Sequence, residues 1–284
     1  LYLSILLVLE ILFFMLSKHY SPIYMIKEKA LDLGWGIHNA VAMIFLTVMP
    51  LCIYRAFNNI KKNWYYLLYY IFLFLLEVFI VCKGGVLAAL IGSIIAFIGL
   101  MYFAKEYRKP LVITFVSFIA VAVLGLVIVI ASKSSLANHL NLNNWFSRTD
   151  IWTSALKIFK QNPIFGIGLV APCGWSVSLT FPNYQFAHNT FIEILVIGGI
   201  FGTLCFLYHL VEKYSRVLYK FNFKKFIILL FFLYPALYGL IDNTYLEITY
   251  TIYFLFALCV IDKEFEGEEI KWLIHFNKND KASE

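Results

Sequence analysis

Long apolar stretches alternate with short polar connections along most of the chain, and one longer polar segment interrupts them. A helix that spans a bilayer needs about 20 mainly apolar residues. Eight stretches approach that length: residues 1–16, 35–54, 64–82, 86–104, 111–131, 190–210, 226–241 and 246–261. We therefore predict an all-α, polytopic membrane helix bundle with about eight transmembrane helices. Five fall within residues 1–131 and three within residues 190–261.

The longer polar segment, residues 132–189, is predicted to be an extracytoplasmic loop that contains a short amphipathic helix. From Ser147 to residue 161 the apolar residues recur every three to four positions, as on one face of a helix. Ser147, with Asp150 three residues later, resembles a capping box that would begin this helix. Asn162 and Pro163 end it, because proline cannot continue a helix.

Glycines mark two further features of this part of the sequence. Gly166 and Gly168 permit a tight bend after the loop helix, where a larger residue would block the approach of the backbone. Gly198, Gly199 and Gly202, in the next span, form a pattern of the G-x-x-x-G kind, which is typical of close helix packing in membranes. We therefore expect the span from residue 190 to pack tightly against its neighbours.

Composition supports the membrane assignment. The chain is 62% hydrophobic and 14% charged, with a mean hydropathy of +0.79, whereas soluble domains carry about 25% charged residues. The net charge of +6 does not indicate nucleic acid, because the basic residues lie between the spans. Of the 23 Lys and Arg, 15 fall in one alternate set of connections and 8 in the other. Since the basic-rich side is usually cytoplasmic, we predict that the polar loop faces the periplasm or exterior and that residues 262–284 form a cytoplasmic tail.

The chain also starts inside an apolar run without a signal-peptide pattern, so we expect that N-terminal helices are missing from it.

Three basic or titratable side chains are the main candidates for chemistry. His188 immediately precedes Asn189, a suitable helix N-cap, and a helix dipole at this position favours a neutral imidazole that could act as a general base. Arg148 carries a fork of donors suited to phosphate. Lys83 lies in the short turn Cys82-Lys83-Gly84-Gly85 between two spans. Each also has a structural alternative: a histidine bonded to a backbone carbonyl, an arginine paired with Asp150 or a lipid headgroup, and a lysine that snorkels to the headgroups.

Other motifs narrow the class of function. The sequence has no Asp-x-Asp pair, no His/Cys cluster, no H-E-x-x-H motif and no P-loop, so it supports neither a metal site nor an ATPase, and we predict no cofactor. The five cysteines show no metal-like spacing and are interpreted as packing residues. Glu77, inside a span, needs a partner or a cavity. Asp242, Asn243 and Glu247 are interpreted as turn residues. Cations and one base at an outward-facing membrane surface suit an anionic lipid headgroup such as a diphosphate.

The polar loop and its flanks resemble the O-antigen ligase and polysaccharide polymerase family of bacterial membrane proteins. The resemblance covers about 60 residues and comprises, in order, Ser147-Arg148, Trp152, Asn162-Pro163-Ile164-Phe165-Gly166-Ile167-Gly168, His188-Asn189-Thr190-Phe191-Ile192-Glu193-Ile194-Leu195 and Gly198-Gly199-Ile200-Phe201-Gly202. It implies that Arg148 and His188 are catalytic. A second family arginine corresponds here to Lys83, which cannot grip a phosphate with two parallel hydrogen bonds. We assign Lys83, Trp152, Asn189 and Glu193 to substrate binding, although Trp152 could instead anchor the loop helix.

This resemblance implies a metal-independent glycosyltransferase in the bacterial inner membrane. We predict that it polymerises undecaprenyl-diphosphate-linked repeat units of a surface polysaccharide, with the lipid-linked donor, a glycan or lipid acceptor, membrane lipids and other export or assembly proteins as partners. A ligase that transfers the glycan to a lipid or protein is the alternative, since only the acceptor differs. A transporter or flippase of lipid-linked glycans is the rival of another class, although no internal repeat is evident. A non-catalytic partner of such an enzyme is a further option.

Overall fold

A computed structural model describes residues 2–21, 24, 31–33, 36–80, 82–109, 111–116, 119–120, 143–168 and 187–242. The elements are α1 (Tyr2–Ser17), β1 (Asp32–Leu33), β2 (Gly36–Ile37), α3 (His38–Asn58), α4 (Ile60–Asn63), α5 (Tyr65–Phe79), α6 (Lys83–Phe103), η1 (Lys105–Tyr107), α9 (Asn143–Gln161), α10 (Thr190–Leu218) and α11 (Phe223–Gly239). The predicted helical architecture is confirmed for these ranges. A two-residue antiparallel pair, β1 with β2, precedes α3 and was not predicted.

Three of the described helices are long and apolar enough to cross a membrane: Asn39–Asn58, Gly84–Phe103 and Thr190–Leu218. Two shorter apolar helices, Ser4–Ser17 and Tyr65–Phe79, match two more of the predicted spans, and α11 matches another with 17 residues. The span predicted at 246–261, the tail 262–284 and most of the span at 111–131 lie outside the described residues. The count of eight spans therefore stays a prediction.

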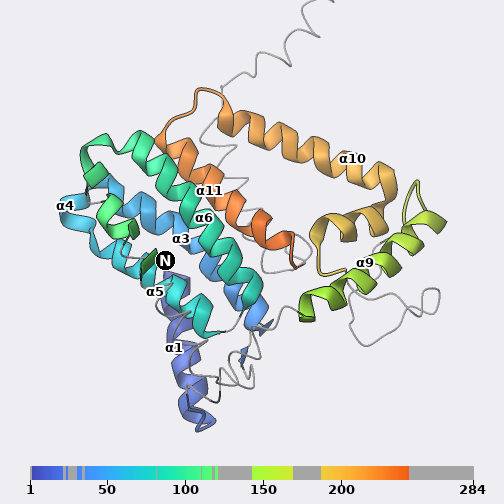
Figure 1. Ribbon diagram of the computed structural model, residues 1–284, viewed down its shortest axis with the longest axis horizontal. Coiled ribbons are helices and arrows are strands. Elements are labelled where there is room, and N and C mark those ends of the chain that lie inside the picture. The colour runs from blue at the N-terminus through green and yellow to red at the C-terminus, as the bar shows by residue number, and fades with distance from the viewer. Residues whose placement is uncertain are drawn as a thin grey trace, which may run out of the picture.

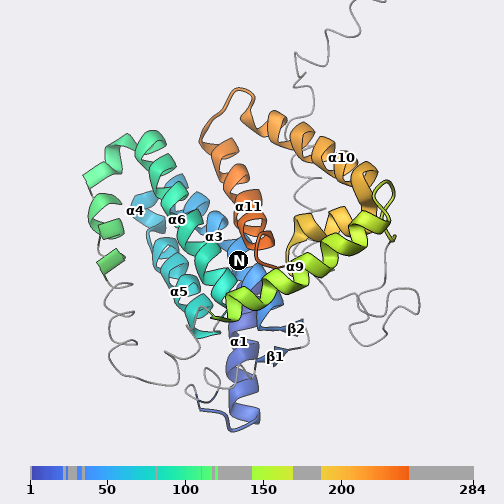
Figure 2. The same cartoon turned by 45° about the vertical axis from the view of Figure 1, so that its right-hand side comes forward.

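Helix α3 lies at the centre of the bundle, between α5, α6 and α11 (Figures 1 and 2). Most of its apolar side chains are buried, and Phe45 and Met49 are fully so. Helices α6 and α11 approach closely because Gly92 and Gly99 leave room for the rings of Tyr234 and Phe226. This region holds the main hydrophobic core, which fixes the end of α11 relative to the first turns of α3 and α6.

Polar side chains inside the bundle are bonded to one another. The Tyr70 hydroxyl lies 2.6 Å from Ser93 Oγ and 2.7 Å from the Tyr234 hydroxyl, which links α5, α6 and α11. Such pairing is required because no water is available in a bilayer core to satisfy these groups. Glu77 differs: it is fully buried, and neither carboxyl oxygen has a hydrogen-bond partner among the described residues.

Three basic connections meet at one end of the bundle. The Phe57 ring, at the end of α3, lies 6.2 Å from the ring of Tyr107 in η1 and 6.2 Å from that of Phe223, where α11 begins. Phe103, at the end of α6, lies 6.1 Å from the same Phe223 ring. These are three of the connections predicted to be cytoplasmic. Their grouping at one end is what that prediction requires, and the orientation in the membrane remains a prediction.

Helix α10 is broken at Gly199, where φ is 60° and ψ is −163°. Residues 162–168, which we call the clasp, occupy the break, and α9 packs beside the short first half of α10 (Figure 2). The clasp replaces helix hydrogen bonds lost at the break with four others: Ile167 N–H to Val196 O (3.0 Å), Gly168 N–H to Ile197 O (2.9 Å), Ile200 N–H to Pro163 O (2.8 Å) and Phe201 N–H to Ile164 O (3.1 Å). The half-helix 190–198 is thereby fixed to the end of α9.

The glycines of this region have roles that differ in part from the prediction. Gly166 and Gly168 adopt positive φ values of 67° and 78°, which confirms the predicted bend. The predicted G-x-x-x-G packing face is wrong for the described residues. A Cβ at Gly202 would meet nothing within 4 Å, and one at Gly198 would meet only a backbone nitrogen at 3.9 Å. Gly199 is needed instead at the break, where a Cβ would come within 2.4 Å of Ile164 O.

Candidate active site

The three backbone carbonyls that directly follow α11 receive hydrogen bonds from α9 and from the N-cap and first residue of α10. Asn189 Nδ2 donates to Leu240 O (2.9 Å) and Thr190 Oγ1 to Asp242 O (3.1 Å), while Arg148 Nη1 donates to Ile241 O. Carbonyls at a helix C-terminus have no partner within their own helix. The end of α11 therefore joins the loop helix and the half-helix of α10 to the bundle.

Asp242 is the centre of the polar cluster at this end of the bundle. Its Oδ1 lies 3.1 Å from His188 Nδ1. Its Oδ2 accepts hydrogen bonds from Asn39 Nδ2 (2.6 Å) and from the Tyr238 hydroxyl (3.3 Å). The side chain is 14% exposed. These partners come from α3, from α11 and from the residue before the N-cap of α10, and a cluster of donors of this kind stabilises a carboxylate.

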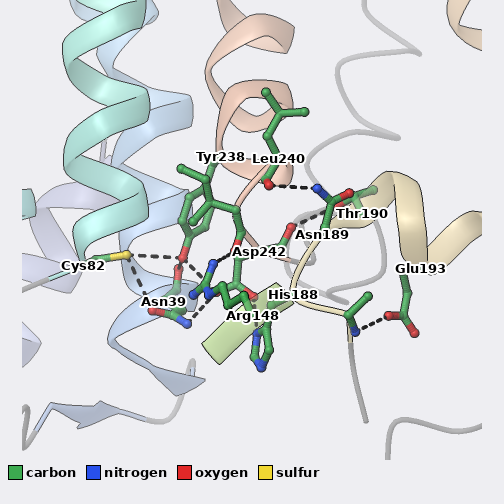
Figure 3. Close-up of polar contacts among 12 residues, drawn as sticks. Asn39, Cys82, Arg148, His188, Asn189, Thr190, Glu193, Tyr238, Leu240 and Asp242 are labelled. Atoms are coloured by element: carbon green, nitrogen blue, oxygen red, sulfur yellow. Dashed lines mark hydrogen bonds and ion pairs between the residues drawn. The ribbon is translucent and has the colours of Figure 1, made fainter. Parts of the chain in front are cut away.

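His188 points one ring nitrogen at this carboxylate and leaves the other open. Its backbone has a φ of 47°, and its side chain is 43% exposed. An N–H on Nδ1 facing Asp242 leaves the lone pair on Nε2. Within the described part of the chain no group bonds Nε2, and Figure 3 shows the ring directed away from the bundle. The arrangement is that of a base whose tautomer is set by a carboxylate.

Arg148 lies beside His188, because Ile241 and Asp242, the residues that they contact, are consecutive (Figure 3). The Arg148 contact to Ile241 uses Nη1 alone, and guanidinium has five N–H donors. The alternative partner, Asp150, is exposed and forms no ion pair with Arg148 within the described ranges. The guanidinium thus retains donors for an anion.

Lys83 is the first residue of α6, and only its backbone is described. Cys82, directly before it, lies 3.3 Å from the Tyr238 hydroxyl and 3.5 Å from Asn39 Oδ1. The backbone of Lys83 therefore lies next to the cluster around Asp242. Whether its ammonium reaches the same site as Arg148 stays a prediction.

Several helices begin at this site. Asn39 is in the first turn of α3, Cys82 is the N-cap of α6, and Thr190 is the first residue of α10. Each helix N-terminus carries a partial positive charge, and together with the Arg148 guanidinium they make the region favourable for an anion. Phosphate groups are commonly bound in such surroundings.

The residues assigned to substrate binding make structural contacts. Asn189 caps α10 as predicted, because its Oδ1 accepts from Phe191 N–H (3.0 Å) and Ile192 N–H (3.1 Å). Trp152 Nε1 donates to Ala187 O (2.7 Å), and the buried carboxylate of Glu193 accepts from Ala187 N–H (2.8 Å). Their role in substrate binding stays a prediction.

Sequence reasoning missed Asp242, Asn39 and Tyr238 as members of the site. Asp242 had been assigned to a turn, and it does follow the end of α11. The available signal was the four-residue spacing of Tyr238 and Asp242, which places both on one face of a helix. Within the described ranges, no three His, Cys, Asp or Glu side chains are grouped as a metal would require.

A comparison with known protein families finds a match that includes this part of the chain. A family model described as O-antigen ligase matches residues 68–207, a stretch that includes Lys83, Arg148 and His188. No curated protein matches the sequence. The matched region holds the loop helix, the clasp and the histidine motif, and over these residues the chain is similar to the O-antigen ligase family.

Proposed function

We propose that this protein is a metal-independent glycosyltransferase that polymerises undecaprenyl-diphosphate-linked repeat units of a surface polysaccharide. The observation that carries the proposal is the pairing of His188 Nδ1 with Asp242 Oδ1 at 3.1 Å, beside Arg148. A base with an open nitrogen and a cation with free donors are the groups that such a transfer needs. The family match supports the same class of chemistry.

In the proposed reaction, a hydroxyl of the acceptor sugar gives its proton to His188 Nε2. The hydroxyl oxygen forms a bond to the anomeric carbon of the donor glycan, and the bond from that carbon to the diphosphate oxygen breaks. The electron pair of that bond leaves with the lipid diphosphate. Attack from the side opposite the leaving group inverts the anomeric configuration. Asp242 holds the imidazole in place and stabilises its protonated form.

Arg148 and Lys83 would bind the diphosphate and stabilise the charge that develops on it. Preorganised cations and dipoles are often the largest contribution to catalysis, and the N-termini of α3, α6 and α10 add partial positive charge near the site. The lipid tail would lie along the membrane-facing helices. In the predicted orientation, the reaction would take place at the outer surface of the cytoplasmic membrane.

The test is a transfer assay with purified protein in detergent or liposomes, a lipid-diphosphate-linked repeat unit as donor, and no metal or nucleotide. Products are separated by gel. A ladder that lengthens with time supports the polymerase. Replacing His188 with alanine should abolish the ladder while the protein still inserts, and wild-type product from that variant would refute the proposal.

A ligase is the second candidate, because the matched family is described by that activity. It uses the same donor and the same residues but transfers the glycan to a lipid or protein acceptor. Adding such an acceptor to the assay separates the two: a single modified acceptor indicates a ligase, and a ladder without it indicates a polymerase. Movement of intact donor across the bilayer with no new glycosidic bond would indicate a flippase.

A further inference from the structure

The backbone of Ala187, the residue before His188, is bonded on both sides of its Cα to side chains of two different helices. The Ala187 carbonyl accepts a hydrogen bond from Trp152 Nε1 of α9 (2.7 Å), and its N–H donates to Glu193 Oε2 of α10 (2.8 Å). Ala187 is fully buried and Glu193 is 1% exposed. The N–H and the C=O of Ala187, which belong to two consecutive peptide groups, are therefore both satisfied by side chains rather than by regular secondary structure.

Trp152 and Glu193, whose side chains bond to the Ala187 backbone, belong to two helices that are joined to each other. Ala155, Ala187 and Val196 form a small hydrophobic cluster of their own, with Trp152 and Phe159 packed against it. The clasp joins the end of α9 to the break in α10 by four backbone hydrogen bonds. Trp152 and Glu193 are thus held at a fixed separation, with Ala187 between them.

The two hydrogen bonds to the Ala187 backbone help to set the backbone conformation of His188. His188, the residue after Ala187, has a φ of 47°, a left-handed conformation that is unfavourable for a residue with a side chain. Such a conformation persists only where the surroundings determine it. On one side Ala187 is gripped, and on the other Asn189 caps α10, so the backbone of His188 is set at both ends. This backbone directs the imidazole at Asp242.

We propose that Trp152 and Glu193 are positioning residues for His188, acting through the backbone of Ala187 rather than by contact with the glycan. The inference rests on the proposed function of His188 as the base. Loss of either hydrogen bond to Ala187 lets the imidazole move away from Asp242. Small misplacements of a reacting group can lower a rate by as much as about 100-fold.

The experiment compares four variants of the full chain in the donor transfer assay. Trp152→Phe keeps an aromatic ring but removes the N–H donor, and Glu193→Leu removes the acceptor. Glu193→Gln retains an oxygen that can accept from Ala187. Phe159→Leu is the control, because Phe159 packs on the same cluster but forms no part of the grip.

We expect Trp152→Phe and Glu193→Leu to lower kcat by about 10- to 100-fold with the KM for the donor changed less than about twofold. Glu193→Gln should restore most of kcat, and Phe159→Leu should stay near wild type. A raised KM with normal kcat would overturn the inference in favour of glycan binding. Equal losses in Phe159→Leu would overturn it in favour of packing alone.

His188→Ala distinguishes this inference from the proposed function. Full activity of His188→Ala would refute the role of the base itself. An inactive His188→Ala together with a fully active Trp152→Phe would refute only the positioning role. If Glu193→Leu does not insert, Trp152→Phe decides the matter, because it preserves the ring that packs in the cluster.

Discussion

His188 Nδ1 lies 3.1 Å from Asp242 Oδ1, although the two residues are 54 positions apart. The carboxylate fixes the ring tautomer and stabilises the imidazolium that forms when the ring accepts a proton. We therefore expect Asp242→Asn to lower the transfer rate by about 10²- to 10⁴-fold, the contribution of a positioned acid–base group. The measurement is kcat for polymer formation with a saturating lipid-linked donor.

A matched control for this prediction is Asp150→Asn, which neutralises an exposed carboxylate on α9. It should leave kcat within about twofold of wild type, since exposed charges contribute little. Asp242 also accepts from Asn39 and Tyr238, so the amount of inserted protein must be measured for each variant. A normally inserted Asp242→Asn protein with wild-type kcat would show that the carboxylate has no role in proton transfer.

Arg148→Lys should lower activity even though the charge is kept. Arg148 donates to Ile241 O through Nη1 and has further N–H groups that can bind a phosphate at the same time. Lysine is a point charge without this fork, so it cannot serve both partners with the same geometry. We expect kcat/KM for the donor to fall by about tenfold or more, as for loss of a charge-assisted hydrogen bond. Equal kcat/KM values for wild type and Arg148→Lys would mean that a positive charge at this position is enough for activity.

At Lys83 we expect arginine to serve as well as lysine or better, in contrast to the loss expected for Arg148→Lys. It opens α6 next to the cluster around Asp242, and the family resemblance places an arginine there. Lys83→Arg should therefore keep or improve the affinity for the diphosphate donor, whereas Lys83→Met should weaken it. The assay is the KM for the donor, with Lys105→Met at the opposite end of the bundle as the control. Loss of activity in Lys83→Arg, with normal insertion, would contradict a phosphate-binding role.

Local chemistry was enough to predict several parts of this structure. The Asn189 cap, the positive φ of Gly166 and Gly168, and the loop helix each depend on a few neighbouring residues. The helix begins at Asn143 rather than Ser147, so the capping box predicted at Ser147 is wrong: that residue lies within the helix, where the backbone N–H groups are already bonded.

Long-range contacts could not be predicted in the same way. Asp242 has the sequence context of a turn residue, and its importance comes from Asn39 of α3 and from His188, just before α10, which the fold brings to it. Gly199 shows a different limit. A pair of glycines in a span is compatible with close helix packing and with a helix break, because both require the absence of a side chain. The clasp that occupies the break lies more than 30 residues earlier in the chain.

The break at Gly199 leads to a stability prediction with an internal control. Gly199 has φ 60° and ψ −163°, a region that essentially only glycine adopts, and a Cβ there would lie 2.4 Å from Ile164 O. Gly199→Ala should therefore destabilise the protein by about 2 kcal/mol or more. Gly202→Ala, three residues later, meets none of the described residues within 4 Å and should be neutral or slightly stabilising, since alanine favours a helix by about 1 kcal/mol over glycine.

Thermal unfolding in one detergent, followed for wild type and both variants, measures this difference. Gly168→Ala should fall between the two, because its φ of 78° disfavours a side chain but no atom of the described part of the chain lies within 4 Å of the added Cβ. The order of melting temperatures should then be Gly202→Ala, Gly168→Ala, Gly199→Ala, from highest to lowest. Because the clasp sets the half-helix that carries Asn189 and Glu193, Gly199→Ala should also lose transfer activity at temperatures where it remains folded. A Gly199→Ala protein as stable and active as Gly202→Ala would show that α10 can run unbroken through this position.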